Sequence, residues 1–281
     1  MKRVFLLMMC ISLCLILAGC SKAGKPVPES WKEKSAKKAQ MEEEKKREEE
    51  AEKPEVVRNE DKVVEAPKIE LDREFVVVID PGHGGKFSGA EGGGLYEQDE
   101  TLKLAKYVFD RLSKTDNVKV LLTRERDVEL DSDLAADLEK RCEFAKENGA
   151  DLLVSLHFNA SDDHSAKGTC VYVTNRKKIK KSSEKLADAL IGEICGLGLE
   201  NRGVLTRNSN DMMDDEGKPL DYYAILRHSS NRGIVSVIVE CCFIDNESDR
   251  EFIETEEAKE ALADAITQGI LRYCSEMEES E

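Results

Sequence analysis

From residue 75 onward, short runs of β-branched and other apolar residues alternate with stretches of helical periodicity. Five apolar runs predict strands, at residues 75–79, 118–123, 151–156, 169–174 and 234–239. Four segments with apolar residues three or four positions apart predict helices, at residues 98–112, 131–148, 182–195 and 256–274. This alternation is typical of α/β domains, so we expect a mostly parallel twisted sheet with helices on both faces in a single domain.

The residues on either side of this pattern differ in composition. Residues 1–19 combine Lys2 and Arg3 with an apolar run that is too short for a settled transmembrane helix, which is the layout of a secretory signal peptide. Residues 20–74 are rich in Lys, Glu and Ala and carry almost no apolar period, so we expect a charged tether, either disordered or helical. The domain that carries the chemistry is then expected at residues 75–275, followed by an acidic tail at 276–281.

Charge and cysteine content narrow the class of protein. The formal net charge of −16 argues against nucleic acid as a partner, because a phosphate backbone would be repelled across most of the surface. Six cysteines lie in the domain: Cys142, Cys170, Cys195, Cys241, Cys242 and Cys274. The domain is long enough to bury a core without disulfides, and no Cys-x-x-Cys spacing occurs in it. We therefore expect mostly reduced thiols, with three disulfides as the alternative.

Polar residues follow three of the predicted strands. His83 comes directly after the first strand, His157 ends the third and Glu240 ends the last, and parallel strands place such residues at one edge of the sheet. Glu97 follows the glycine-rich segment 89–94 and can fold back over the same edge. Two histidines and one carboxylate are a known ligand set for catalytic zinc, and a further carboxylate can accept a proton from a water bound there.

Two other histidines and one long segment are also candidates for a functional role. His164 and His228 lie in polar surroundings, so we expect them at the surface. Residues 205–223 are predicted to form a loop long enough to have a functional role.

Several separated motifs, in this order, resemble the N-acetylmuramoyl-L-alanine amidases of the zinc-dependent amidase-3 type. They are VIDPGHGG at 78–85, EQD at 97–99, LTR at 122–124 with Asp127, SLHFNA at 155–160, NRGV at 201–204 and VECCFIDN at 239–246. The resemblance extends from Phe75 to Tyr273. It implies the α/β fold expected above and a hydrolase that acts on peptidoglycan, at the amide between N-acetylmuramic acid and the L-alanine of the stem peptide.

The resemblance also implies roles for individual residues. His83, Glu97 and His157 are expected to bind one zinc ion, and Glu240 is expected to act as the catalytic base that takes a proton from the attacking water. Two alternatives remain open from the sequence: a non-catalytic module that binds peptidoglycan, and a zinc peptidase that cuts within the stem peptide.

Four further residues are candidates for roles near this site. Arg227 and Asn159 are candidates for substrate contacts, and a surface ion pair is the alternative for Arg227. Cys241 and Cys242 depart from the family, which commonly has small residues after this glutamate. We expect them to be packing residues, the alternatives being a competing ligand or an oxidation-sensitive site.

The end of the signal segment has its own resemblance. Leu17, Ala18, Gly19 and Cys20 resemble the lipobox of bacterial lipoproteins, which implies cleavage before Cys20 and a lipid on its sulfur. The expected location is outside the cytoplasm, anchored to the cell membrane by this lipid. No sequence feature indicates an activator protein.

Overall fold

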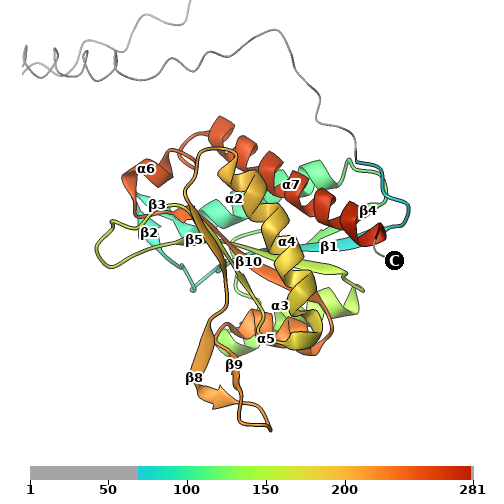
Figure 1. Ribbon diagram of the computed structural model, residues 1–281. Helices are drawn as coiled ribbons and strands as arrows, with labels where there is room; N and C mark the ends of the chain where they lie inside the picture. Colours follow the sequence, from blue (N-terminus) through green and yellow to red (C-terminus); the bar gives the residue numbers. More distant parts are fainter. Residues whose placement is uncertain (1–68, 280–281) are drawn as a thin grey trace, which may run out of the picture. The chain divides into compact units, whose positions relative to one another are not determined.

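The computed structural model describes residues 69–279. The expected signal peptide, Cys20 and most of the expected tether lie outside the described residues. Strands occupy β1 (Phe75–Pro81), β2 (Glu91–Gly92), β3 (Leu95–Tyr96), β4 (Val118–Leu122), β5 (Leu152–Asn159), β6 (Thr169–Val173), β7 (Asn201–Leu205), β8 (Asn208–Met213), β9 (Pro219–Asp221) and β10 (Val235–Phe243). Helices occupy α2 (Glu97–Leu112), α3 (Leu134–Glu147), α4 (Lys177–Cys195), α5 (Ala224–Asn231), α6 (Glu247–Arg250) and α7 (Glu256–Glu278) (Figure 1).

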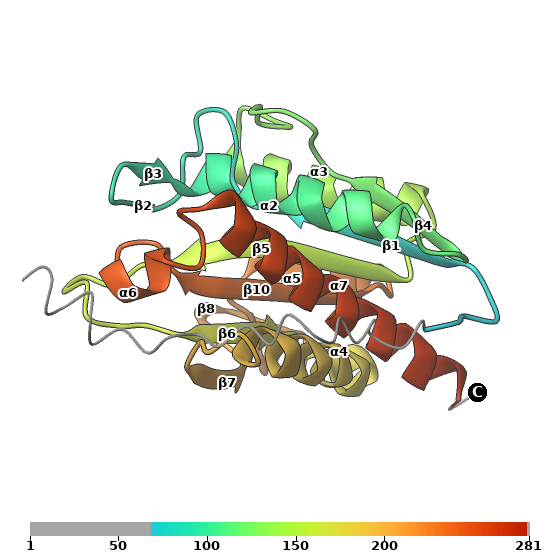
Figure 2. The same ribbon diagram turned by 90° about the horizontal axis from the view of Figure 1, so that it is seen from above.

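Six strands form the central sheet in the order β4-β1-β5-β10-β6-β7. Strands β4, β1, β5 and β10 are parallel, β6 is antiparallel to β10, and β7 is parallel to β6. Helices α2, α4 and α7 cover one face, and α3 and α5 cover the other (Figure 2). The expected mostly parallel α/β fold is therefore confirmed, with β6 and β7 running opposite to the other four strands.

Alternation along the central strands divides their side chains between two cores. In β1, Val77 and Ile79 pack in the cluster under α2, α4 and α7, whereas Val78 packs in the cluster under α3 and α5. Leu153 in β5 and Ile238 in β10 also belong to the second cluster. Successive side chains of a strand point to opposite faces. Asp80, Ser155, His157 and Glu240 lie two or four positions after these residues, so they are on the face of the second cluster.

Capping side chains mark where two of the helices begin. The side chain of Asp133 accepts a hydrogen bond from the backbone N–H of Ala136 at 3.0 Å, and that of Thr255 accepts one from Ala258 at 3.1 Å. Each satisfies one of the backbone donors left open at a helix N-terminus. None of the helices within residues 69–279 is long and apolar enough to cross a membrane.

Several boundaries differ from the sequence-based expectation. Strand β5 runs to Asn159 and β10 to Phe243, so His157 and Glu240 lie inside their strands and not at the ends. Helix α4 begins at Lys177, and α7 continues to Glu278, so the first residues of the expected acidic tail are helical. Residues 205–223, expected as a loop, contain the antiparallel hairpin β8–β9.

All six cysteines in the described range are free thiols. Cys241 and Cys242 are both fully buried and belong to the same hydrophobic cluster. Adjacent strand residues normally face opposite ways, but the pairing of β10 with β5 shifts register between Glu240 and Phe243, and this irregularity allows both thiols to turn inward. Their burial supports the expectation that they are packing residues.

Candidate functional site

The loop after β1 presents His83 at the carboxyl edge of the sheet. His83 has a φ of 63°, in the left-handed region that few non-glycine residues occupy. Its Nε2 lies 3.1 Å from Oε2 of Glu97. The imidazole is only partly buried, so one side of it remains open to solvent.

Glu97 is the first residue of α2, and its side chain is only 4% exposed. Both carboxylate oxygens are engaged: Oε2 accepts from the N–H of Ala90 at 2.8 Å, and Oε1 accepts from the N–H of Phe158 at 3.0 Å. Burial alone would raise the pKa of Glu97, but hydrogen bonds and charge from His157 and His83 outweigh it and hold the pKa well below its usual range. The group is therefore a carboxylate at neutral pH.

His157 projects from β5 toward the same carboxylate. Its Nδ1 lies 2.9 Å from Oε1 of Glu97, and its ring meets that of His83 edge-on, with centroids 4.9 Å apart. Burial lowers the pKa of His157, but the hydrogen bond and charge of Glu97 overcome this and leave it raised. One donor atom each from His83, Glu97 and His157 lies within 4.8 Å of the other two, and within residues 69–279 this is the one such group that could hold a metal ion.

Gly82 allows the His157 ring to occupy its place. A Cβ atom at this position would lie 2.3 Å from Cε1 of His157 and 2.5 Å from its Nε2, closer than any van der Waals contact permits. The ring can therefore pack against the loop only because residue 82 has no side chain.

Gly82→Ala is expected to displace the His157 ring from Glu97 and to weaken metal binding at this group by at least about tenfold. Bound metal after dialysis against graded free metal concentrations measures the effect. Gly192→Ala in α4 is the control, because the nearest atom to its added Cβ is Nη1 of Arg272 at 3.9 Å. Equal metal affinity in the two variants would contradict the packing argument.

Glu240 lies beside His157 in the sheet. The two residues are paired in the register of β10 and β5, and the backbone carbonyl of Glu240 accepts from Oγ1 of Thr169 at 3.0 Å. Burial raises the pKa of Glu240 to about 7, an effect that His157 opposes and the charge of Glu97 reinforces. A carboxyl group with a pKa near neutrality can both accept and return a proton.

The structure also places Asn159, Arg227, His164 and His228. Oδ1 of Asn159 accepts from the N–H of Ala160 at 2.9 Å. Arg227 lies on α5, where its Nη1 donates to the carbonyl of Asp221 at 2.7 Å, so its partner is backbone rather than the carboxylate of an ion pair. His164 is at the surface as expected, with its side chain 71% exposed, whereas His228 is half-buried beside α3.

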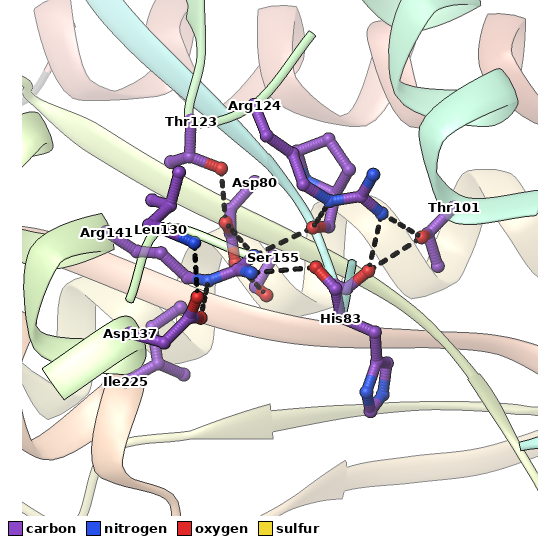
Figure 3. Close-up of polar contacts among 12 residues, drawn as sticks. Asp80, His83, Thr101, Thr123, Arg124, Leu130, Asp137, Arg141, Ser155 and Ile225 are labelled. Atoms are coloured by element: carbon purple, nitrogen blue, oxygen red, sulfur yellow. Dashed lines mark hydrogen bonds and ion pairs between the residues drawn. The ribbon is translucent and has the colours of Figure 1, made fainter. Parts of the chain in front are cut away.

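A set of charged side chains next to the His83 loop has no role expected from the sequence: Asp80, Arg124, Asp137 and Arg141 (Figure 3). All four are buried, and Arg141 joins the two carboxylates. One signal was available, since Asp80 directly continues an apolar strand, where a charged side chain must find a buried partner.

Residues 77–272 match the family described as N-acetylmuramoyl-L-alanine amidase. The chain belongs to this family. The enzyme class expected from the motifs, an N-acetylmuramoyl-L-alanine amidase, is thus confirmed at the level of the family, together with the fold.

Individual relatives agree with this assignment. The chain is 34% identical over 197 residues to the uncharacterized protein YqiI of Bacillus subtilis, covering 70% of this chain and 84% of that one. It is 30% identical over 198 residues to the N-acetylmuramoyl-L-alanine amidase LytC of the same organism, but spans only 35% of its length. The crystal structure of an N-acetylmuramoyl-L-alanine amidase from Clostridium difficile 630 aligns with a TM-score of 0.60 and 28% identity, over 72% of this chain and 97% of that one.

Proposed function

We propose that this amidase-family chain is a zinc-dependent peptidoglycan hydrolase that cleaves the amide between N-acetylmuramic acid and the L-alanine of the stem peptide. The observation that carries the proposal is the convergence of His83, Glu97 and His157, with donor atoms within 4.8 Å of one another, beside Glu240 in the register of the sheet. The family match and the named amidase relatives support the same chemistry.

The donor set fits one zinc ion. Two imidazole nitrogens and one carboxylate oxygen are ligands that zinc takes in hydrolases, with a fourth position left for water or substrate. Zinc bound there would polarise the scissile carbonyl and lower the pKa of a water molecule. Hydrogen bonds from Ala90 and Phe158 to Glu97 would hold its carboxylate in a fixed orientation toward the ion.

Glu240 is the proposed proton carrier. Its carboxylate would accept a proton from the attacking water and deliver it to the departing amine nitrogen as the amide C–N bond breaks. A pKa raised to about 7 by burial supports a role for the same side chain in both steps. No covalent bond between the protein and the substrate is required. Arg227 and Asn159 remain candidates for contacts to the substrate.

Digestion of purified peptidoglycan tests the proposal. An amidase releases intact stem peptides that begin with a free L-alanine amine, which mass spectrometry identifies. A zinc peptidase acting within the stem would release single amino acids or peptide fragments, and a binding module would release nothing. Either of these results overturns the proposed reaction, and activity that survives removal of zinc by a chelator overturns the metal dependence.

Peptidoglycan lies outside the cytoplasm, so its hydrolysis requires an exported enzyme. This agrees with the exported, lipid-anchored location expected from the first twenty residues. We propose that a lipid on Cys20 anchors the mature chain to the membrane and that the charged segment after it spaces the domain from the bilayer.

Cys20→Ser is expected to move the protein from the detergent-rich phase to the aqueous phase in phase partitioning, because the sulfur that carries the lipid is gone. Cys195→Ser, a change at a half-buried thiol of the domain, is the control and should partition as the parent does. A Cys20→Ser protein that still partitions with the detergent would contradict the anchor.

A further inference from the structure

Two arginines are buried beneath the loop that carries His83. Arg141 extends from α3, and Arg124 lies just after β4. Their guanidinium groups are directed at the backbone of the loop (Figure 3). Nη1 of Arg141 is 2.9 Å from Oδ1 of Asp80, and its Nε is 2.7 Å from Oδ1 of Asp137. The side chains of Arg141 and Asp80 are each 1% exposed, so this pair is sealed from water.

Between them, the two arginines donate to three consecutive backbone carbonyls, and Nη1 of Arg124 also donates to the carbonyl of Arg126 at 3.2 Å. Arg141 donates to the carbonyl of Pro81 at 2.8 Å and to that of His83 at 2.7 Å. Arg124 donates to Pro81 at 3.0 Å and to Gly82 at 2.8 Å. Every carbonyl from the end of β1 to His83 therefore accepts a charge-assisted hydrogen bond, the stronger kind in a buried setting.

Arg124 also joins this loop to the helix that begins at Glu97. Its Nη2 donates to the carbonyl of Gln98 at 2.7 Å, in the first turn of α2. Oγ1 of Thr101 in the same helix donates to the carbonyl of Gly82 at 2.9 Å. The guanidinium of Arg124 thus fixes the segment that carries His83 relative to the helix that carries Glu97.

The third member is reached through Asp80. Its Oδ2 accepts from Oγ of Ser155 at 2.6 Å, and Ser155 lies two residues before His157 on the same face of β5. The cluster of Asp80, Arg124, Asp137 and Arg141 consequently contacts the segments that carry all three proposed ligands.

A contribution to the stability of the fold does not by itself explain this buried charged cluster. Buried ion pairs are costly to desolvate, and well-packed apolar side chains often replace them without loss of stability. The loop above, by contrast, needs external support, because His83 is held at a φ of 63°, a conformation that a non-glycine residue keeps only when its surroundings impose it. Both arginines donate hydrogen bonds to the backbone of that loop.

We propose that Arg124 and Arg141 are positioning residues for the metal site, holding the backbone from Pro81 to His83 so that the imidazole of His83 stays beside Glu97. Neither arginine touches the metal or the substrate; both act through the loop. The inference rests on the proposed zinc function and adds to it two residues that determine the affinity for the ion and its geometry.

Arg141→Lys and Arg124→Lys test the role in the full chain. Lysine keeps the positive charge but lacks the rigid fork that bridges several acceptors. We expect the zinc dissociation constant, measured by competition with a chelator, to rise by about 10- to 100-fold. The visible absorption spectrum of the cobalt(II)-substituted protein should also change, because it reports the geometry of the ligands. Thr101→Val, which removes one donor to Gly82, should shift the zinc constant in the same direction by less.

Leu190→Ala is the control for a loss of general stability. Leu190 is fully buried in α4, where it packs against Gly269 of α7, on the face of the sheet opposite α3 and Arg141. This variant should lower the unfolding temperature while its zinc constant stays within about twofold of the parent value, since distant sites act independently.

The outcomes separate the two proposals. Arginine variants that fold, bind zinc as tightly as the parent and keep its cobalt spectrum would overturn the positioning role alone. A similar loss of zinc affinity in Leu190→Ala would also overturn it, because the effect would then follow stability. A parent chain that binds neither zinc nor cobalt would overturn the proposed function as well. If Arg141→Lys fails to fold, Arg124→Lys and Thr101→Val decide the question by the same measurements.

Discussion

Glu240→Gln is expected to lower kcat on purified peptidoglycan by a factor on the order of a hundred to ten thousand while the protein keeps its zinc. The amide is close in size and shape to the carboxylate, but it cannot accept a proton from water. Substrate binding should change little, because Glu240 is proposed to act on the proton and not to hold the ground state.

The measurement is turnover beside bound zinc for parent and variant. Glu200→Gln, which makes the same charge change at an exposed position, is the control and should retain parental turnover. Zinc lost together with activity would place Glu240 among the ligands and leave the base unassigned. Activity retained within a few-fold would overturn its role as base.

Removal of any one proposed ligand is expected to have an equally large effect. His83→Ala, Glu97→Ala and His157→Ala should each lower bound zinc to a small fraction of one ion per chain and abolish turnover, because two protein ligands hold zinc poorly. Glu97→Ala should also lower the unfolding temperature most, since it leaves the N–H groups of Ala90 and Phe158 without their acceptor, the second of them buried.

Mass spectrometry of bound metal and circular dichroism distinguish the two effects. His164→Ala is the matched control, since that histidine is largely exposed and pairs with Asp245 at 2.8 Å instead of with Glu97. A variant that keeps full zinc would remove its residue from the ligand set, and zinc loss in His164→Ala would indicate a site elsewhere.

The central strands were predictable from sequence because β1, β4, β5 and β10 consist of apolar runs that a buried sheet requires. The start of α4 was missed because Lys177–Lys181 contains four lysines and gives little apolar periodicity. Strand β8 was missed for a related reason: its residues are mostly polar and exposed, so pairing and not burial determines its conformation. Strands β7 and β9 are short and contain no run of buried apolar residues.

Some residues of the candidate site were also predictable from the sequence, and others were not. His83 and His157 could be placed at one edge because each follows or ends an apolar run. Their distances to Glu97 depend on how the segment 89–94 folds back, and glycines allow many paths there. Arg141 could not be assigned from sequence, because within a helix pattern a buried arginine looks like an exposed one until its partner Asp80, from a distant strand, is known.

The hairpin β8–β9 projects from the sheet as a separate two-stranded unit (Figure 1). Its base is fixed, since Asp221 accepts from Oγ1 of Thr174 at 2.7 Å and from the N–H of Asn175 at 2.6 Å. Gly217 at its tip has no atom of another segment within 4 Å of where a Cβ would stand. Each doubling of a flexible loop costs only about 0.6 kcal/mol in closure entropy. The tip is therefore a position where insertions, deletions or a fluorescent label can be accepted without shifting the register of any core strand.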